Sequence, residues 1–145
     1  MELSPPLLPG AKVVCSKTVS ESDVYLFAGI TGDLAPNHVD EAFMKKSAFG
    51  RRIAHGALIV GYMSRASSLI IERAPPSPEG YSAVSAGYDK VRFLKPVFIG
   101  DTITITYEVE RLELARHRTI AKVEVTNERG ELVAVADHIL QWVKA

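Results

Sequence analysis

The sequence has little from which to build covalent cross-links or a strongly charged surface. Cys15 is the single cysteine in 145 residues, so no disulfide can form within the chain, and a reducing, cytoplasmic compartment is the expected location. The 17 basic and 17 acidic residues cancel, and no basic stripe is present. Because phosphate neutralisation supplies most of the affinity for nucleic acid, we expect no nucleic-acid partner.

Long apolar runs are also missing. The longest, ALIVGYM at 57–63, is far shorter than the ~20 residues that a membrane helix needs. The N-terminal MELSPPLLPG has an acid and prolines where a signal peptide has basic residues, so we expect neither a leader nor a membrane association. A hydrophobic fraction of 47% is enough for a buried core. We predict one domain over 1–145, with 1–10 as an extended arm because proline fixes φ.

The first half of the sequence predicts one strand and two principal helices. Residues 11–19 are rich in β-branched side chains, which favours a strand. Ser20 and Asp23 resemble a capping box that starts a helix ending near Gly32. Residues 54–74 are the longest helical segment, apolar on most faces over its first half, so we expect it to be buried on nearly all sides. The prolines within 75–80 end it.

The second half predicts long antiparallel strands. In TITITYEVERLEL the apolar residues alternate with polar ones, which is typical of a half-buried strand. HRTIAKVEVTN repeats the pattern, NERG at 127–130 is a hairpin turn, and 131–144 reads as a last strand. A sheet of this kind must cover the long helix. We therefore predict an α+β hot-dog fold, an antiparallel sheet wrapped around one long central helix.

The stretch TGDLAPNHVDEAF places an acid and a histidine on either side of a proline. Pro36 disfavours helical geometry for Ala35, so the pattern predicts a loop in which Asp33 and His38 reach one small volume. A carboxylate can take a proton from water that an imidazole orients, which is general acid–base chemistry. The alternative is local: Asp33 as a turn residue and Asp40 as the cap of a short helix within 40–49.

Residues 27–64 resemble the MaoC-like (R)-specific enoyl-CoA hydratases, and 91–103 resemble that family's second recurring stretch. The family pattern is Phe-Ala, then Thr-Gly-Asp, Pro-x-His-x-Asp, a Phe, and Ile-x-His-Gly before a buried helix. The positions that match are Phe27, Ala28, Thr31, Gly32, Asp33, Pro36, His38, Asp40, Phe43, Phe49, Ile53, His55 and Gly56.

The resemblance implies an activity and a role for each matching residue. The family adds water syn across the double bond of a trans-2-enoyl-CoA to give an (R)-3-hydroxyacyl-CoA, and also catalyses the reverse. Asp33 would activate the water, and His38 would orient it and help to deliver a proton. The N–H of Gly56 would hold the thioester oxygen, which agrees with the unpaired N–H groups of a helix start. Ser64 would hydrogen-bond the acid.

The chain departs from the family pattern just before the proline, where the usual Asn is Ala35. Asn37, after the proline, is the candidate replacement. Arg51 and Arg52 precede the long helix and are candidates for contacting the phosphates of coenzyme A, with a solvated loop as the alternative. We expect no cofactor other than the coenzyme A of the substrate.

The remaining histidines are expected to be structural. His55, at the start of a buried helix, should satisfy loop backbone, since buried polar groups are normally paired. His117 should be exposed in a charged turn, and His138 should be an ordinary strand residue. No two histidines have metal-ligand spacing with a third ligand nearby, so we predict no metal.

Two other functions remain open. One is an acyl-CoA thioesterase, in which an acid on the central helix would attack the carbonyl carbon; here that helix has no acid before Glu72. The other is a non-catalytic acyl-binding subunit. In each case an open sheet edge is an aggregation risk, so we expect a homodimer or a dimer-based higher oligomer.

Overall fold

The computed structural model describes residues 5–77 and 80–144. Residues 1–4 of the predicted arm and 78–79 of the predicted proline stop lie outside this part of the chain. In chain order the elements are β1 (Lys12–Thr18), α1 (Glu21–Thr31), α2 (Pro36–Val39), α3 (Glu41–Met44), α4 (Gly56–Arg73), β2 (Tyr81–Phe93), β3 (Thr102–Glu113), a 3₁₀ turn (Leu114–Arg116), β4 (Arg118–Thr126) and β5 (Leu132–Lys144).

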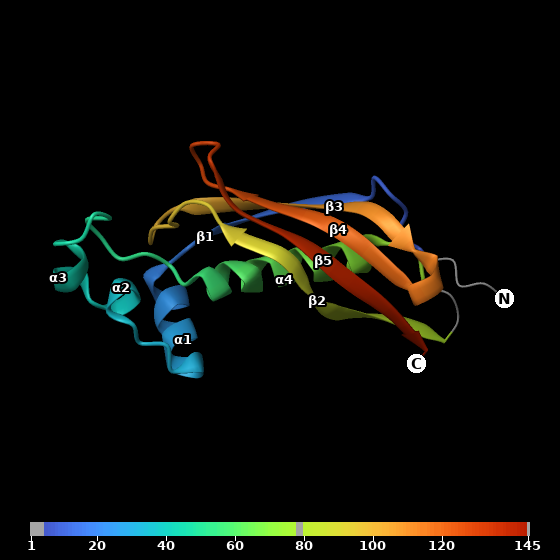
Figure 1. Ribbon diagram of the computed structural model, residues 1–145, viewed down its shortest axis with the longest axis horizontal. Helices are drawn as coiled ribbons and strands as arrows, with labels where there is room; N and C mark the ends of the chain where they lie inside the picture. Colours follow the sequence, from blue (N-terminus) through green and yellow to red (C-terminus); the bar gives the residue numbers. More distant parts are fainter. Residues whose placement is uncertain (1–4, 78–79, 145) are drawn as a thin grey trace.

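The five strands form one antiparallel sheet in the order β1-β3-β4-β5-β2. The last three strands make the predicted meander, and β1 and β2 take the two edges. The sheet curls over α4, while α1, α2 and α3 gather at one end of the molecule (Figure 1). This arrangement confirms the predicted hot-dog fold.

The core lies between the inner face of the sheet and one side of α4. On β3, the alternating residues Ile103, Ile105, Tyr107 and Val109 are all buried, as their spacing predicted. α4 approaches the sheet most closely at β1 and β3. The strands β5 and β2 therefore lie further from α4 than β1 and β3 do.

The expectation that α4 is buried on nearly all sides is wrong for the single chain. Ile59, Met63 and Ile70 face the core, whereas the small residues Gly61 and Ser64 are exposed. One sheet can cover only one side of a helix, so the other side of α4 lies open. Small side chains on that side would allow another backbone to approach closely.

The start and end of α1 follow the predicted local signals. The Ser20 hydroxyl accepts a hydrogen bond from the Asp23 N–H, and the Asp23 carboxylate accepts one from the Ser20 N–H. At the other end Gly32 adopts a left-handed conformation with φ of 77°, which glycine enters without steric cost. That cap turns the chain toward α2.

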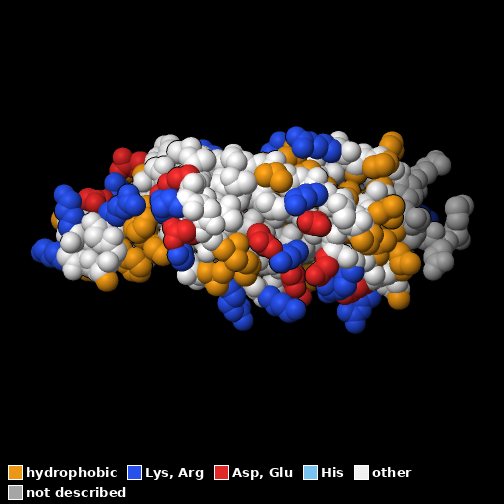
Figure 2. Space-filling view, turned by 90° about the horizontal axis from the view of Figure 1, so that it is seen from above, with side chains coloured by type: hydrophobic (Ala, Val, Ile, Leu, Met, Phe, Trp, Pro, Cys, Tyr) orange, Lys and Arg blue, Asp and Glu red, His pale blue; other side chains and the backbone are white. Residues whose placement is uncertain are grey.

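Charges of both signs alternate across the outer face of the sheet (Figure 2). Lys12 pairs with Glu108 across β1 and β3, and Lys122 pairs with Glu124 on β4. Exposed pairs of this kind add little stability. They give the sheet a mixed surface without a broad region of one sign.

His138 occupies β5, as predicted, but it is completely buried. Its Nδ1 lies 2.8 Å from the Tyr107 hydroxyl and its Nε2 lies 2.8 Å from Ser85 Oγ. Burial lowers the pKa of His138 to about 4. The imidazole is therefore neutral inside the fold over the range in which an unfolded histidine takes up a proton.

Because the unfolded chain binds this proton near the ordinary pKa of about 6.5, stability is fully present above that pH and declines as the pH falls toward 4. For the wild type we expect the free energy of unfolding to fall by about 2 kcal/mol more between pH 7 and pH 5 than for His138→Gln. Urea unfolding at both pH values measures this. In the control His117→Gln, at an exposed position, the free energy of unfolding should fall between pH 7 and pH 5 by as much as in the wild type. An equal fall in the wild type, His138→Gln and His117→Gln would contradict the prediction.

Candidate functional site

The segment that carries the predicted acid and histidine is partly helical. We expected a loop, but Pro36 begins the single helical turn α2, and His38 belongs to that turn. Proline suits the first position of a helix because its missing N–H would have no partner there. Ala35 stays extended, with ψ of 139°, as expected for a residue before proline.

This turn brings Asp33, His38 and His55 together, with one nitrogen or oxygen of each within 4.8 Å of the others. The His38 Nδ1 lies 2.7 Å from the Ile53 carbonyl oxygen. A carbonyl can only accept, so Nδ1 carries the proton and Nε2 is the free nitrogen of the neutral ring. The prediction that Asp33 and His38 share one small volume is confirmed.

His55 contacts both members of this pair. Its Nε2 donates to the Asp33 carbonyl oxygen at 3.0 Å, and its ring stacks on the His38 ring with centroids 3.7 Å apart. Phe27 packs against its other side at 4.6 Å. Its Nδ1 is buried and has no hydrogen-bond partner among the described residues. The structural role expected for His55 agrees with these contacts.

The spacing argument against a metal needs correction, because the fold joins histidines that the sequence separates by 17 positions. These three residues have the ligand types and proximity that a metal ion can use. The His55 nitrogen nearest the Asp33 carboxylate, however, already donates to the Asp33 carbonyl. The arrangement therefore favours a proton-transfer pair, and the absence of a metal stays a prediction.

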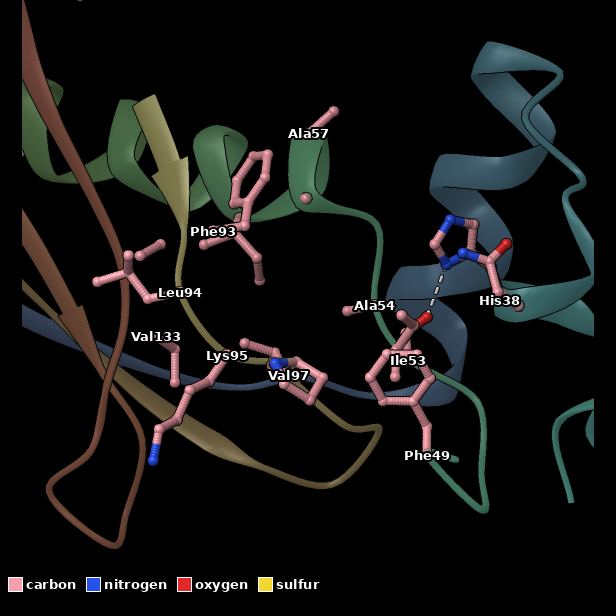
Figure 3. Close-up of a pocket in the computed structure, with 15 residues that line it drawn as sticks. His38, Phe49, Ile53, Ala54, Ala57, Phe93, Leu94, Lys95, Val97 and Val133 are labelled. Atoms are coloured by element: carbon pink, nitrogen blue, oxygen red, sulfur yellow. Dashed lines mark hydrogen bonds between the residues drawn. The ribbon is translucent and has the colours of Figure 1, made fainter. Parts of the chain in front are cut away.

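A cavity of about 560 Å³ opens beside His38 and reaches Gly56 at the start of α4 (Figure 3). Most of its lining is apolar, including Phe49, Phe93 and Val97. Such a cavity, with a few placed polar groups, is typical of a small-molecule site. Asp33 lies at its edge, with its side chain 51% exposed, and is not part of the lining.

Gly56 is the first residue of α4, where a backbone N–H has no partner within the helix. The next bonds of the helix come from Leu58 and Ile59, which both donate to the His55 carbonyl. A Cβ at this position would lie 2.6 Å from the Phe93 ring, so the ring would have to move to admit any larger residue. Gly56 lines the cavity, so its N–H at the positive end of the helix dipole is a candidate for stabilising an anion there.

The two supporting residues do not lie as expected. The Asn37 backbone carbonyl accepts a hydrogen bond from the Ile53 N–H at 3.0 Å, while its side chain lines the cavity. Within the described ranges the Ser64 hydroxyl makes no hydrogen bond with Asp33. It lies near the Tyr88 hydroxyl instead, where its contact partly offsets the rise that burial causes in the Tyr88 pKa.

The two arginines before α4 have different surroundings. Arg52 is nearly buried and binds the Glu41 and Glu21 carboxylates at 2.6 Å each, as well as the Tyr25 hydroxyl at 2.9 Å. These bonds raise the pKa of Arg52 and lower that of Glu41. Arg52 is thus occupied in joining α1 and α3, and a phosphate contact is not open to it. Arg51 is exposed and stacks over the Phe98 ring at 3.9 Å.

The β2 side of this site contains Phe93, which sequence reasoning did not identify. Phe93, at the end of β2, covers Gly56, and Lys95 lines the cavity while its ammonium pairs with Glu131. Both lie in the stretch 91–103 that was noted for its family resemblance. Only the return of β2 beside β5 places this stretch opposite α4, and no local pattern reports that pairing.

The adjacent arginines provide a matched test of the Arg52 contacts. We expect Arg52→Gln to lower the free energy of unfolding by about 1 kcal/mol, since it breaks a network that includes a nearly buried guanidinium. Arg51→Gln should change it by less than about 0.5 kcal/mol, because the arginine is exposed. Urea denaturation compares the two, and equal losses would show that the Arg52 network does not stabilise the fold.

An Asp–His pair beside an apolar cavity, opposite the amide of a helix start, defines an acid–base site on a hot-dog fold. The MaoC like domain matches residues 8–131. The chain therefore belongs to the MaoC-like dehydratase family.

Two curated relatives and one solved structure illustrate the similarity. An (R)-specific enoyl-CoA hydratase of Rhodospirillum rubrum is 40% identical over 103 residues, which is 71% of this chain and 66% of that protein. A 3-hydroxybutyryl-CoA dehydratase of Methylorubrum extorquens is 34% identical over 126 residues, 87% of this chain and 74% of that protein. The (R)-hydratase structure from Aeromonas caviae superposes with a TM-score of 0.81 at 27% identity, over 93% of this chain and 96% of that one.

Each helix in the described ranges is too short or too polar to span a lipid bilayer.

Proposed function

We propose that this protein is a hydro-lyase that adds water across the double bond of a trans-2-enoyl-CoA, or a related enoyl thioester, and catalyses the reverse dehydration. The observation that carries the proposal is the convergence of Asp33 and His38 at the edge of a cavity that extends to the Gly56 amide. The relatives named as enoyl-CoA hydratases and hydroxyacyl-CoA dehydratases support the same chemistry.

The proposed chemistry uses the two proton-accepting side chains and the Gly56 amide. The Asp33 carboxylate takes a proton from water while the oxygen adds to C3 of the enoyl chain. Negative charge then develops on the thioester oxygen, where the Gly56 N–H can stabilise it. The His38 Nε2 accepts a hydrogen bond from the same water, and a proton passes from this pair to C2. Because water and proton come from one side, the addition is syn. The (R) configuration of the 3-hydroxyacyl product is proposed from the relative named as an (R)-specific enoyl-CoA hydratase.

The acid–base step is complete with these side chains and water, so no cofactor is proposed beyond the coenzyme A of the substrate. Arg51 is the arginine free to meet a coenzyme A phosphate, since Arg52 is held by two carboxylates. The cytoplasmic location stays a prediction.

The direct test is turnover of crotonyl-CoA, followed by loss of the enoyl absorbance, with chiral analysis of the product. We expect Asp33→Asn and His38→Gln each to lower kcat by about 10²–10⁴-fold, since each removes a proton-transfer group. Asp89→Asn, at an exposed position on β2, should leave kcat within twofold. Full activity in Asp33→Asn, or an (S) product, would contradict the assigned roles.

Gly56 offers a separate test of the oxyanion role. Gly56→Ala should lower kcat by roughly 10²-fold or more, because the added methyl meets the Phe93 ring and displaces the N–H from the thioester oxygen. Gly61→Ala adds a methyl to the same helix away from the cavity and serves as the control, provided that size exclusion shows an unchanged oligomeric state. Adding Phe93→Leu to Gly56→Ala should recover part of the loss; no effect of Gly56→Ala on kcat would remove the amide from the mechanism.

The thioesterase alternative would place an acid on the central helix α4, and the described acids of that helix do not support it. Glu72 is the first acid of α4, and it lies near the far end of the helix, exposed and paired with Arg65 at 3.0 Å. The non-catalytic alternative is disfavoured by the assembled Asp33 and His38 pair. Release of free thiol from acyl-CoA would identify the first activity, and binding without turnover the second.

We further propose that the protein acts as a homodimer. The edge strand β2 leaves Val84 exposed, and the exposed side of α4 has small residues. Around the half-exposed Asp33, the apolar side chains of Leu26, Ile30 and Leu34 are between 63% and 82% exposed. A second copy would cover these surfaces, since exposed apolar patches of this kind mark interaction sites.

Light scattering after size exclusion should give twice the 15.8 kDa chain mass, or a multiple of that dimer. Val84→Lys should shift the protein toward monomer, because a charge would be buried at the proposed interface. Val14→Lys, an exposed valine on the opposite edge strand β1, is the control. A monomeric wild type at micromolar concentration would contradict the dimer.

A further inference from the structure

A second group of polar side chains lies inside the fold, away from Asp33 and His38. At its centre the buried His138 contacts the Tyr107 hydroxyl through Nδ1 and Ser85 Oγ through Nε2, both at 2.8 Å. The Tyr88 ring packs on His138 with centroids 4.4 Å apart. We call these four residues the His138 cluster. The acid–base mechanism uses none of them.

The His138 cluster contains one buried hydroxyl without a hydrogen-bond partner among the described residues, that of Tyr88. A neutral imidazole has one N–H and one lone pair, so one of the Tyr107 and Ser85 hydroxyls donates to it and the other accepts from it. Where Ser85 is the accepting hydroxyl, its own O–H can reach solvent because Ser85 is exposed. The Tyr88 hydroxyl is buried and has no hydrogen-bond partner in the described part of the chain; Ser64 lies near it without forming a regular bond. Unpaired buried donors are costly, so this group favours an incoming acceptor.

Two bulges in β2 direct this cluster toward the interior. Side chains alternate along a regular strand, so residues three or five positions apart should face opposite sides. The register of β2 shifts between Ser85 and Gly87 and again between Asp89 and Arg92. Ser85, Tyr88 and Phe93 therefore all lie on the face of the sheet that carries His138, although Ser85 and Phe93 remain exposed. Bulges that re-aim side chains are typical of functional sites.

The same strands connect the His138 cluster with the substrate cavity. Phe93 and Ala134 are paired across β2 and β5, and both line the cavity. The pair of Tyr88 and His138 lies four residues further along β5 than the pair of Phe93 and Ala134. Four residues correspond to a distance of about 13 Å along the strand. Between these levels, the inward side chain of β5 is the small Ala136.

The facing surface of α4 continues in the same direction. Ile59 lines the cavity, and one turn further Met63 is buried. Methionine adapts its shape readily, and α4 stands closer to β1 and β3 than to β5 and β2. A small side chain, Ala136, and a flexible one, Met63, thus lie between the cavity and the His138 cluster, and both are buried.

We propose that the His138 cluster is the far end of the acyl site, and that the enzyme prefers enoyl thioesters whose chain bears an uncharged oxygen, a keto or hydroxyl group, at the depth of Tyr88. This inference rests on the proposed hydratase function. A plain alkyl chain that reached this depth would bury methyl groups against an unpaired O–H donor. A carboxylate is excluded because its burial requires a paired cation, whereas the imidazole here is neutral.

The test compares 2-octenoyl-CoA and 2-decenoyl-CoA with the same thioesters bearing a keto group on the penultimate carbon, and uses crotonyl-CoA as a reference too short to reach the cluster. For the acyl chain long enough to reach Tyr88, we expect kcat/KM to be at least tenfold higher for the keto substrate than for the plain substrate of the same length. The keto oxygen would gain one uncharged hydrogen bond and give the Tyr88 hydroxyl a partner. Tyr88→Phe should reduce this ratio about tenfold while leaving crotonyl-CoA turnover within twofold.

The controls separate this inference from the proposed function. Tyr81→Phe, on the same strand at the opposite end from Phe93, should retain the preference. In Asp33→Asn the saturated keto and plain acyl-CoA pair can be compared by calorimetry, so a binding preference is measurable even if no thioester is turned over. A keto-to-plain ratio near one at every length, or a ratio unchanged by Tyr88→Phe, would overturn the inference and assign the His138 cluster to bound water.

Discussion

The site depends on how the backbone of Ile53 is held. Its N–H donates to the Asn37 carbonyl and its carbonyl accepts from His38 Nδ1. These two bonds join the turn α2 to the segment that leads directly into α4. They also fix the tautomer of His38, so that the nitrogen with the lone pair is the one left for chemistry. The Gly56 amide, three residues after Ile53, is thereby positioned relative to His38.

A second constraint acts through His55. This side chain holds the Asp33 carbonyl and stacks on His38, so it orients both members of the pair without reaching the cavity lining. Because the two imidazole rings are stacked, positive charges on both at once would repel each other. The Nδ1 of His55 is buried and has no hydrogen-bond partner in the described part of the chain.

Local signals in the sequence predicted much of the fold. The capping box at Ser20 and the period-2 pattern of β3 each depend on interactions within a few residues, and both are confirmed. The pairing of Asp33 with His38 was predictable because a proline turn separates them by only five positions. The one-turn helix α2 was missed because proline was taken to exclude a helix, although it is well suited to the first helical position.

The features that sequence could not give all arise from tertiary contacts. The stack of His38 on His55 and the pairing of Arg52 with two carboxylates join residues that are 11 to 31 positions apart. The one-sided burial of α4 depends on how far the sheet wraps. The burial of His138 among polar partners depends on bulges in a neighbouring strand, which no periodic pattern in β5 reveals.

The Arg52 contacts have a consequence for how the protein responds to its solution. They tie α1 and α3 to the chain just before α4 through carboxylates that are themselves 41% and 55% exposed, and mobile ions screen such pairs. The sheet and α4 are held together by apolar packing, which salt does not weaken in this way. A higher ionic strength should therefore loosen the end of the molecule that carries Asp33 and His38. It should affect the packing of the sheet on α4 much less.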